Sequence, residues 1–454
     1  MSEHQDDLRG LSPSQKKAML RRMVRNRSGA AAANGSAATA TDAGGDAIPE
    51  SHYRFDKFPL YQQIHAQRDF ARNAGIDNPF FVEHEGCAAD TTLIDGEVVL
   101  DFATYNYLGL NNDPRVLDAV RTASDRHGVS ASASRIVSGE RPPHRELERR
   151  LAELHGVDDA VAFVSGHATN VSTIATLLGP NDLILHDRYI HDSQLQGARL
   201  SGATRRSFPH NDMAALESIL ARERARFEKV LICVEGLYSM DGDVAPLPRL
   251  MELKTRHKAL LMVDEAHSVG VVGERGAGLA EHFDVDGRSV DIWMGTLSKS
   301  LCGCGGYIAG PDALVEMLKC SAPGFVYSVG MPPPVAAACS AALDAMWAEP
   351  WRVDGVRENG RVFLDACRER GLNTGNAEGF CVVPVIVGSS VLAARLANAL
   401  FQAGVNVQPI IYPAVEEDAA RLRFFLSAEH TAEQLVHTAD LVADELTRLR
   451  DETM

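Results

Sequence analysis

The sequence lacks an excess of basic residues. Its 45 lysines and arginines stand against 61 aspartates and glutamates, which gives a formal net charge of −16 at pH 7. Such a surface repels a phosphate backbone, so we do not expect a nucleic-acid-binding protein. The sequence also lacks an apolar run of about 18 residues, the length of a membrane-spanning helix. Its start, MSEHQDDLRG, has no apolar core of a secretory signal. We therefore expect a cytoplasmic protein without a membrane span.

The cysteines lack the regular spacing of a disulfide framework. Eight of them are scattered from Cys87 to Cys381, a pattern typical of reduced thiols in a cytoplasmic protein. The closest pair, Cys302 and Cys304, has no two further ligands nearby in the sequence to complete a zinc site. The sequence therefore predicts no metal.

What the sequence does contain is enough apolar material for a large core. Hydrophobic residues make up 45% of its 454 positions, which favours a globular protein of more than one domain. From about residue 51, short and almost continuous apolar runs alternate with helical periods, as in a parallel sheet that helices cover on both faces. The candidate strands are 161–165, 183–187, 230–236, 259–266 and 292–298. The sequence therefore predicts an α/β fold with a mostly parallel sheet.

The pattern changes after the three consecutive prolines that begin at Pro332. A long helical stretch there leads to two further apolar runs, 382–388 and 421–427, as expected for a separate, smaller α+β unit. The predicted organisation is an N-terminal arm at 51–95, a large domain at 96–340 and a small C-terminal domain at 341–454.

The first 50 residues have a composition of their own. Residues 1–27 include a short basic amphipathic helix, and residues 28–50 form an Ala/Gly/Ser linker with too little apolar surface to fold. A tethered basic helix can act as a docking element for an acidic carrier protein. The alternatives are a tail without a function and a mitochondrial presequence, against which Glu3, Asp6 and Asp7 argue.

Polar side chains follow the predicted strands, at the edge of the sheet where ligands bind. Asp264 ends one strand, Lys299 follows the next, and His191 follows a third. Gly166 and His167 begin a helix, whose free N–H groups and dipole suit a phosphate. A carboxylate for a pyridinium nitrogen, an imine-forming lysine, an aromatic ring for stacking and a phosphate site together describe pyridoxal phosphate.

Longer motifs carry a family resemblance. They include FVSGHATN at 163–170, VEGLYSMDGD at 234–243, VDEAHSVG at 263–270 and GTLSKS at 295–300. From about Phe58 to its end the chain resembles the α-oxoamine synthases, among which are 8-amino-7-oxononanoate synthase, 5-aminolevulinate synthase and serine palmitoyltransferase. The resemblance implies fold type I of the pyridoxal-phosphate enzymes and a homodimer with active sites at the interface. It also implies a decarboxylative condensation of an α-amino acid with an acyl thioester, borne by a carrier protein or coenzyme A, which gives an α-aminoketone.

The same resemblance assigns residues to the cofactor ring. Lys299 would form the imine and act as the base, and Asp264 would pair with the pyridine nitrogen. His191 would stack on the ring as a further catalytic group. His267 and Ser239 would lie on the side of the ring hydroxyl.

The resemblance also assigns residues to the cofactor phosphate and to the substrate. The phosphate would be held by Gly166, His167, Thr296 and, from the partner subunit, Ser328. Arg423 would bind the substrate carboxylate through two hydrogen bonds, and Tyr105 would line the amino-acid site. Gln408 stands where some members have an arginine for a dicarboxylic acyl chain, so such a donor would lack its ionic partner here.

Two other functions fit parts of the pattern. Another fold type I reaction, such as transamination or aldolase-type cleavage, would use the same lysine. A catalytically silent scaffold would bind the cofactor too, but such proteins usually lose the lysine or its partners, and Lys299 and Asp264 are both present. The motifs favour the condensing enzymes over both.

Overall fold

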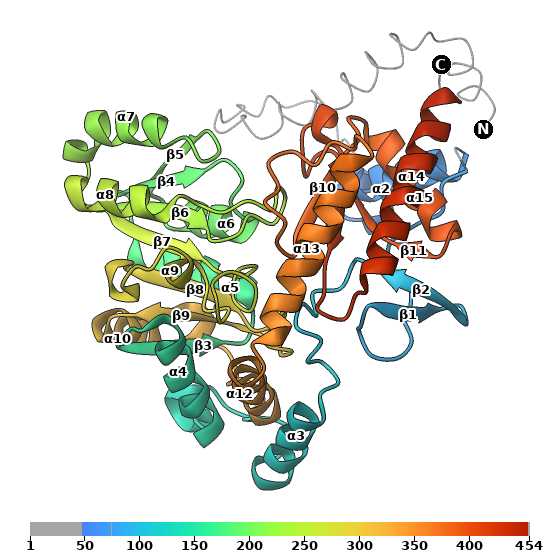
Figure 1. Ribbon diagram of the computed structural model, residues 1–454. Coiled ribbons are helices and arrows are strands. Elements are labelled where there is room, and N and C mark those ends of the chain that lie inside the picture. The colour runs from blue at the N-terminus through green and yellow to red at the C-terminus, as the bar shows by residue number, and fades with distance from the viewer. Residues whose placement is uncertain (1–47, 74, 453–454) are drawn as a thin grey trace. The chain divides into compact units, whose positions relative to one another are not determined.

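The computed structural model describes residues 48–73 and 75–452 (Figure 1). The basic helix predicted within residues 1–27 and most of the predicted linker lie outside these ranges. The chain divides into two units, residues 1–70 and 71–454. In the first unit, the short helices η1 (Glu50–His52) and η2 (Phe55–Lys57) precede α2 (Pro59–Asn73), which ends in the second unit.

A seven-stranded sheet forms the centre of the second unit, in the order β3-β9-β8-β7-β6-β4-β5. Its strands are β3 (Asp159–Phe163), β4 (Leu183–Asp187), β5 (Thr204–Phe208), β6 (Val230–Glu235), β7 (Leu260–Asp264), β8 (Ile292–Thr296) and β9 (Gly306–Gly310). The five neighbouring strands β8, β7, β6, β4 and β5 are parallel to one another. The strand β9 runs antiparallel between β8 and β3. The predicted mostly parallel α/β sheet is confirmed.

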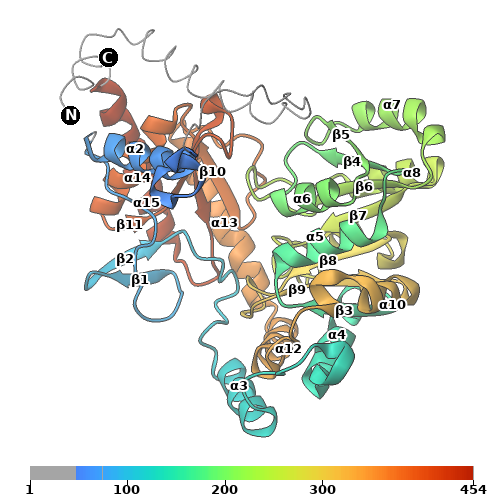
Figure 2. The same cartoon turned by 180° about the vertical axis from the view of Figure 1, so that it is seen from behind.

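Helices cover both faces of this sheet (Figures 1 and 2). The strand β6 shows why the runs are continuously apolar, because Val230, Ile232 and Val234 join one core cluster while Leu231 and Cys233 join another. The first cluster includes side chains of α4 (Pro142–His155), α7 (Met213–Glu223), α8 (Leu247–His257), α9 (Leu279–His282) and α12 (Pro333–Ala348). The second includes side chains of α5 (Gly166–Leu177), α6 (Asp192–Leu200), α10 (Asp312–Ser321) and α11 (Pro323–Val326).

Two of these strands escaped prediction for identifiable reasons. The edge strand β5 exposes Arg205, Arg206 and Ser207, so it has no apolar run. The strand β9, GYIAG, begins within a glycine-rich segment that by sequence is typical of a loop. Hydrophobic periodicity could not reveal either strand, because β5 is solvated and β9 is rich in glycine.

A smaller α+β layer completes the second unit. One of its sheets has the order β10-β13-β12, formed by β10 (Val382–Ile386), β12 (Gln408–Ile410) and β13 (Arg421–Phe425). The other has the order β1-β2-β11, formed by β1 (Thr91–Ile94), β2 (Glu97–Asp101) and β11 (Val405–Asn406). The helices α13 (Trp351–Glu369), α14 (Ser390–Gln402) and α15 (Ala432–Asp451) supply much of its core.

Segments far apart in sequence meet in this layer. The ring of Phe102 lies 5.5 Å from that of Phe424 and 5.8 Å from that of Phe363. The helix α12 contacts α3 (Pro114–His127) and α4, and its side chains as far as Met346 belong to the core of the large sheet. The predicted boundaries at 95/96 and 340/341 stay predictions.

Among residues 48–73 and 75–452, no helix is long and apolar enough to cross a membrane. The same residues bring together no group of three side chains that could hold a metal ion. All eight cysteines are free thiols.

Candidate active site

The predicted functional residues gather where the parallel strands of the large sheet end. Asp264 is the last residue of β7, Lys299 follows β8 by three residues, and Ser239 follows β6 by four. His191 is the N-cap of α6 after β4, and Gly166 is the first residue of α5 after β3. Because carboxyl ends of parallel strands share one edge of a sheet, the fold brings these residues together.

Asp264 is a buried carboxylate with amide donors around it. Asn170 Nδ2 donates to its Oδ2 over 2.9 Å, Gln194 Nε2 donates to the same oxygen over 3.2 Å, and the N–H of Ala266 donates to Oδ1 over 3.1 Å. Asp264 is only 3% exposed. Hydrogen bonds of this kind stabilise the charged carboxylate, which is the form that can pair with a pyridinium nitrogen.

Lys299 has the properties of an amine that can react. Burial lowers its pKa to about 8, although Asp264 and Glu235 oppose that shift. Its Nζ lies 5.6 Å from the centre of the Tyr105 ring. An amine with this pKa is partly neutral near pH 7, as a nucleophile and base must be.

His267 is held as a neutral imidazole. Burial, followed by the charges of Lys299 and Arg423, lowers its pKa well below the ordinary value. Its Nδ1 lies 2.8 Å from the hydroxyl of Tyr107, and its ring stacks on Phe425 with centroids 6.1 Å apart and planes 12° apart. The contact with Tyr107 therefore occupies Nδ1 of His267, and Nε2 remains available to a ligand.

His191 is the N-cap of α6 and keeps part of its surface exposed to solvent. Its Nδ1 lies 2.7 Å from Ser193 Oγ, and the N–H of Ser193 donates to Nδ1 over 3.3 Å. Burial of the imidazole lowers its pKa, with smaller influences from Asp264 and Lys299. A neutral aromatic ring next to the carboxylate and the amine is suited to cover a planar ligand.

A cradle for an anion lies at the start of α5. Ser165 caps this helix by accepting a hydrogen bond from the N–H of Ala168, and the first N–H groups of a helix have no partner within it. A Cβ on Gly166 would lie 3.0 Å from Thr296 Oγ1, so a larger residue here would crowd the Thr296 hydroxyl. His167 is exposed beside it. This close approach fits a phosphate, so the residues present suit pyridoxal phosphate.

Arg423 reaches this edge from the smaller layer, through β13. Its Nη1 donates to the carbonyl of Ser239 over 3.1 Å, and its guanidinium lies 4.6 Å from the Phe425 ring centroid. Its Nε is buried without a hydrogen-bond partner among the described residues. Gln408 is the strand partner of Arg423 across β12 and β13, so the two side chains lie on the same face. The unpaired donor makes Arg423 suitable for a substrate carboxylate.

The structure brings together most of the predicted residues, but it does not join Ser328 to them. The N–H of Ser328 donates to the carbonyl of Phe325 over 3.4 Å, in the segment after α11. No hydrogen bond or ring contact links Ser328 to the described residues around Lys299. Tyr105, by contrast, packs edge-to-face on Phe425 with centroids 4.9 Å apart.

Sequence reasoning missed the residues that orient the site. Asn170, Ser193 and Gln194 lie on α5 and α6 and are buried, so no strand end marks them. Tyr107 is part of a motif that resembles the family but carries no chemical signal of its own. Asn170 lies four residues after Gly166, on the same face of α5, so the helical period could have pointed to it.

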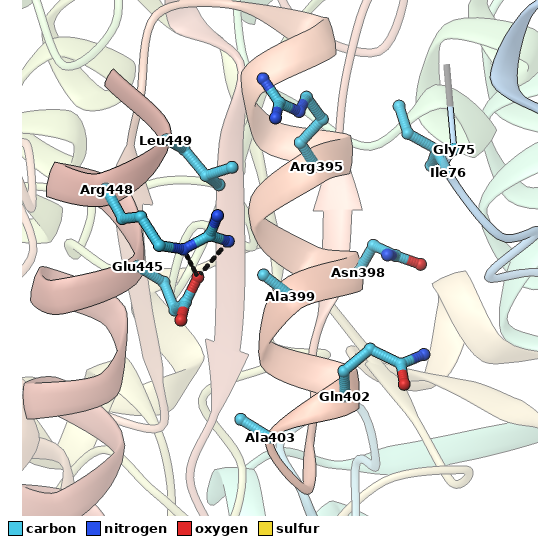
Figure 3. A pocket seen from close by; sticks show the side chains of 10 residues that line it. All are labelled: Gly75, Ile76, Arg395, Asn398, Ala399, Gln402, Ala403, Glu445, Arg448 and Leu449. Carbon is cyan, nitrogen blue, oxygen red and sulfur yellow. Dashed lines mark hydrogen bonds and ion pairs between the residues drawn. The ribbon is translucent and has the colours of Figure 1, made fainter. Parts of the chain in front are cut away.

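The chain also has a cavity away from this edge. It has a volume of about 460 Å³ and lies between α14 and α15 beside Gly75 and Ile76 (Figure 3). Its two arginines are already paired, Arg448 with Glu445 and Arg395 with Glu452, each over 2.6 Å. None of the predicted site residues lines it, and paired arginines leave little charge for a ligand.

Comparison with known proteins agrees with this geometry. The family model "Aminotransferase class I and II" matches residues 97–442. The chain is 40% identical over 364 residues to 8-amino-7-oxononanoate synthase of Symbiobacterium thermophilum, which covers 80% of this chain and 92% of the relative. It is 41% identical over 350 residues to the enzyme of the same name from Beijerinckia indica, covering 77% and 89%.

Solved structures point to the same family. Serine palmitoyltransferase of Sphingomonas wittichii superposes with a TM-score of 0.82 at 28% identity, over 86% of this chain and 98% of that one. A variant from S. paucimobilis, with pyridoxal phosphate and myriocin bound, gives 0.81 at 26% identity with the same coverage. The chain therefore belongs to the aminotransferase class I and II family and, within it, to the α-oxoamine synthases, which makes it a pyridoxal-phosphate-dependent acyltransferase of fold type I.

Proposed function

We propose that Lys299, Asp264 and Arg423 carry out the condensation of an α-amino acid with an acyl thioester. The observation that carries this proposal is their convergence at one edge of the large sheet. A partly neutral amine and a carboxylate with amide donors follow strands of that sheet, and an arginine with an unpaired donor reaches them from β13 of the smaller layer. The relatives named 8-amino-7-oxononanoate synthase and serine palmitoyltransferase support a condensation of this type.

Each residue has a defined task in this proposal. Pyridoxal phosphate, when bound, supplies an electron sink for the α-carbon of the amino acid. Asp264 holds the ring nitrogen, and His191 covers one face of the ring. His267 and Ser239 lie at its hydroxyl, and Gly166, His167 and Thr296 hold its phosphate.

The proton and bond changes then follow from the chain's own groups. Arg423 binds the carboxylate of the amino acid and so fixes which bond at the α-carbon faces Lys299. The neutral amine of Lys299 accepts the α-proton, and the α-carbon forms a bond to the thioester carbonyl while the thiolate leaves and takes a proton from solvent. The carboxylate is then lost as CO2, and Lys299 returns a proton to the same carbon, which gives the α-aminoketone.

A second cleft, which none of the predicted site residues lines, is our candidate for binding part of the acyl donor. This cleft of about 660 Å³ lies near the ends of β4 and β5 and is lined by His186, Arg188 and Tyr189, the last only two residues before His191. Tyr412 and Pro413 of the smaller layer line its other side. We assign this cleft to the carrier portion of the thioester.

The partners and location of the protein belong to the same proposal. We place it in the cytoplasm as a homodimer, with Ser328 reaching the phosphate of the partner's site. Ser328 lies between Tyr327 and Val329, which are 86% and 49% exposed, so a second copy would cover apolar surface there. The donor is an acyl chain on a carrier protein or on coenzyme A.

The proposal is tested by exchange of the α-proton in heavy water. Wild-type protein is incubated with glycine, alanine, serine and longer amino acids, with and without an acyl thioester, beside Lys299→Ala. We expect exchange with one amino acid and a loss of about 10²- to 10⁴-fold in the variant, the usual contribution of a general base. Exchange that persists in Lys299→Ala would remove the lysine from its role as base.

A further inference from the structure

A continuous chain of hydrogen bonds links Asp264 to His191. Asn170 Nδ2 donates to Asp264 Oδ2 and to Ser193 Oγ, in both cases over 2.9 Å. Ser193 Oγ in turn lies 2.7 Å from His191 Nδ1. One amide on α5 thus contacts the partner of the ring nitrogen and, through a single hydroxyl, the residue proposed to cover the ring.

Only one assignment of donors and acceptors fits this series of hydrogen bonds. A carboxylate oxygen of Asp264 is the acceptor, so the amide of Asn170 presents its nitrogen to it. The second hydrogen of that nitrogen points to Ser193 Oγ, which leaves the Ser193 hydroxyl hydrogen for His191 Nδ1. The N–H of Ser193 also donates to Nδ1. His191 Nδ1 is therefore an acceptor, and the neutral ring carries its hydrogen on Nε2.

The local packing is arranged for this contact. A Cβ on Gly197 of α6 would lie 3.0 Å from the backbone oxygen of Asn170, so the glycine allows α6 to approach α5 closely. Asn170 is 2% exposed and Ser193 1%. Among the described residues, the buried side-chain oxygen of Asn170 has no hydrogen-bond partner, which costs stability. The amide therefore contributes through the two hydrogen bonds that its nitrogen donates.

We propose that Asn170 is a positioning residue that holds Asp264 and, through Ser193, fixes His191 as the Nε2–H tautomer. The proposal rests on the proposed roles of Asp264 and His191 toward pyridoxal phosphate. No other standard side chain of this size supplies two donors: aspartate would repel Asp264, and serine has one hydrogen to give. Gln194 also donates to Asp264, but Asn170 is the residue that reaches both groups.

The test uses the full chain with Asn170→Ala and Ser193→Ala. The matched control is Asn406→Ala, because Asn406 is a buried amide that donates to the buried carboxylate of Asp101 over 2.9 Å in the smaller layer. Two quantities are measured: the Kd for pyridoxal phosphate, and the 15N chemical shifts of the His191 ring, assigned by their loss in His191→Gln.

We expect Asn170→Ala to raise the Kd about tenfold, the effect of one hydrogen bond to a charged group. Both Asn170→Ala and Ser193→Ala should move the His191 shifts from those of an Nε2–H ring toward a mixture of tautomers. The control should keep the wild-type shifts and a Kd within about twofold of the wild-type value.

An unchanged Kd and unchanged His191 shifts in Asn170→Ala would overturn the proposal. If Asn170→Ala does not fold, Ser193→Ala decides it, since that variant removes only one hydroxyl, and unchanged shifts there have the same meaning. A wild-type protein that binds no pyridoxal phosphate would contradict the proposed function instead, while the His191 shifts would still decide the role of Asn170.

Discussion

Two partly buried cations, Lys299 and Arg423, lie near the edge of the large sheet, and the loss of surrounding water affects them differently. Loss of water around Lys299 lowers its pKa to about 8, so the amine is neutral in part of the population at neutral pH. Burial also lowers the pKa of Arg423, but a guanidinium keeps its charge throughout the ordinary pH range. The first residue can therefore exchange a proton, and the second can only bind an anion.

This difference gives a prediction for Arg423→Lys. Lysine keeps the charge but loses the planar pair of donors, so we expect the KM for the amino acid to rise about tenfold or more, with a smaller change in kcat. Steady-state kinetics with varied amino acid measure both. Arg206→Lys is the control, because Arg206 is an exposed arginine of β5 that donates to the backbone of Arg205. Equal effects of the two variants would contradict a carboxylate site at Arg423.

At the scale of elements, buried charges hold the connections near the strand ends. His210, between β5 and α7, lies with Nδ1 3.0 Å from Asp187 at the end of β4 and with Nε2 2.8 Å from Asp243, beyond β6. Burial opposes a charge on this ring, but the two carboxylates outweigh it and raise the pKa of His210 to about 10. A nearby pair, Arg421 and Asp241, joins β13 to the segment after β6 over 2.7 Å.

The pKa of His210 makes stability depend on pH. The folded state binds a proton that the unfolded state releases above its ordinary pKa of 6.5, so the stabilisation is complete below pH 6.5 and is lost as pH rises toward 10. We expect the contribution of His210 to lower the free energy of unfolding by up to about 1.4 kcal/mol per pH unit in that window. Above pH 8 the lowered pKa of Lys299 acts in the opposite direction, so the contribution of His210 is the difference between wild type and a variant that lacks it. Urea unfolding between pH 6.5 and 9.5 measures this slope.

His210→Gln should be less stable than wild type at pH 6.5 and should show a flatter pH dependence. The exposed histidine of α15, in the variant His437→Gln, should keep the wild-type slope. A His210→Gln variant with an unchanged slope would show that another group titrates in this window.

At the scale of the whole molecule, the net charge of −16 contrasts with the basic segment near the N-terminus. If that segment steers an acidic carrier protein, deletion of residues 1–50 should lower kcat/KM with a carrier-bound donor by about tenfold at low salt and leave acyl-CoA turnover unchanged. Kinetics with the two donors at two salt concentrations measure this. Replacement of Lys16 and Lys17 by glutamate in the full-length chain separates the charge from the length of the tether. Equal activity of the deletion variant with both donors would remove the docking role.

The sequence by itself determined most of the large sheet and many of the polar residues that follow its strands. The stretches 183–185 and 230–234 are apolar at every position because both faces of these strands are covered. The polar residues that follow these strands, among them His191 and Ser239, must then lie at one edge. Family motifs supplied the roles of Lys299 and Asp264, because chemistry restricts those positions to few residue types.

The tertiary structure alone decided which side chains touch. Arg423 meets Ser239 across 184 positions of sequence, and Tyr107 meets His267 across 160. The link from Asn170 to Asp264 depends on the close approach of α5 and α6 at Gly197. Periodicity reports only how a residue is buried within its own element. The distance between two elements is set by the packing of all the side chains between them, so no local pattern could specify these contacts.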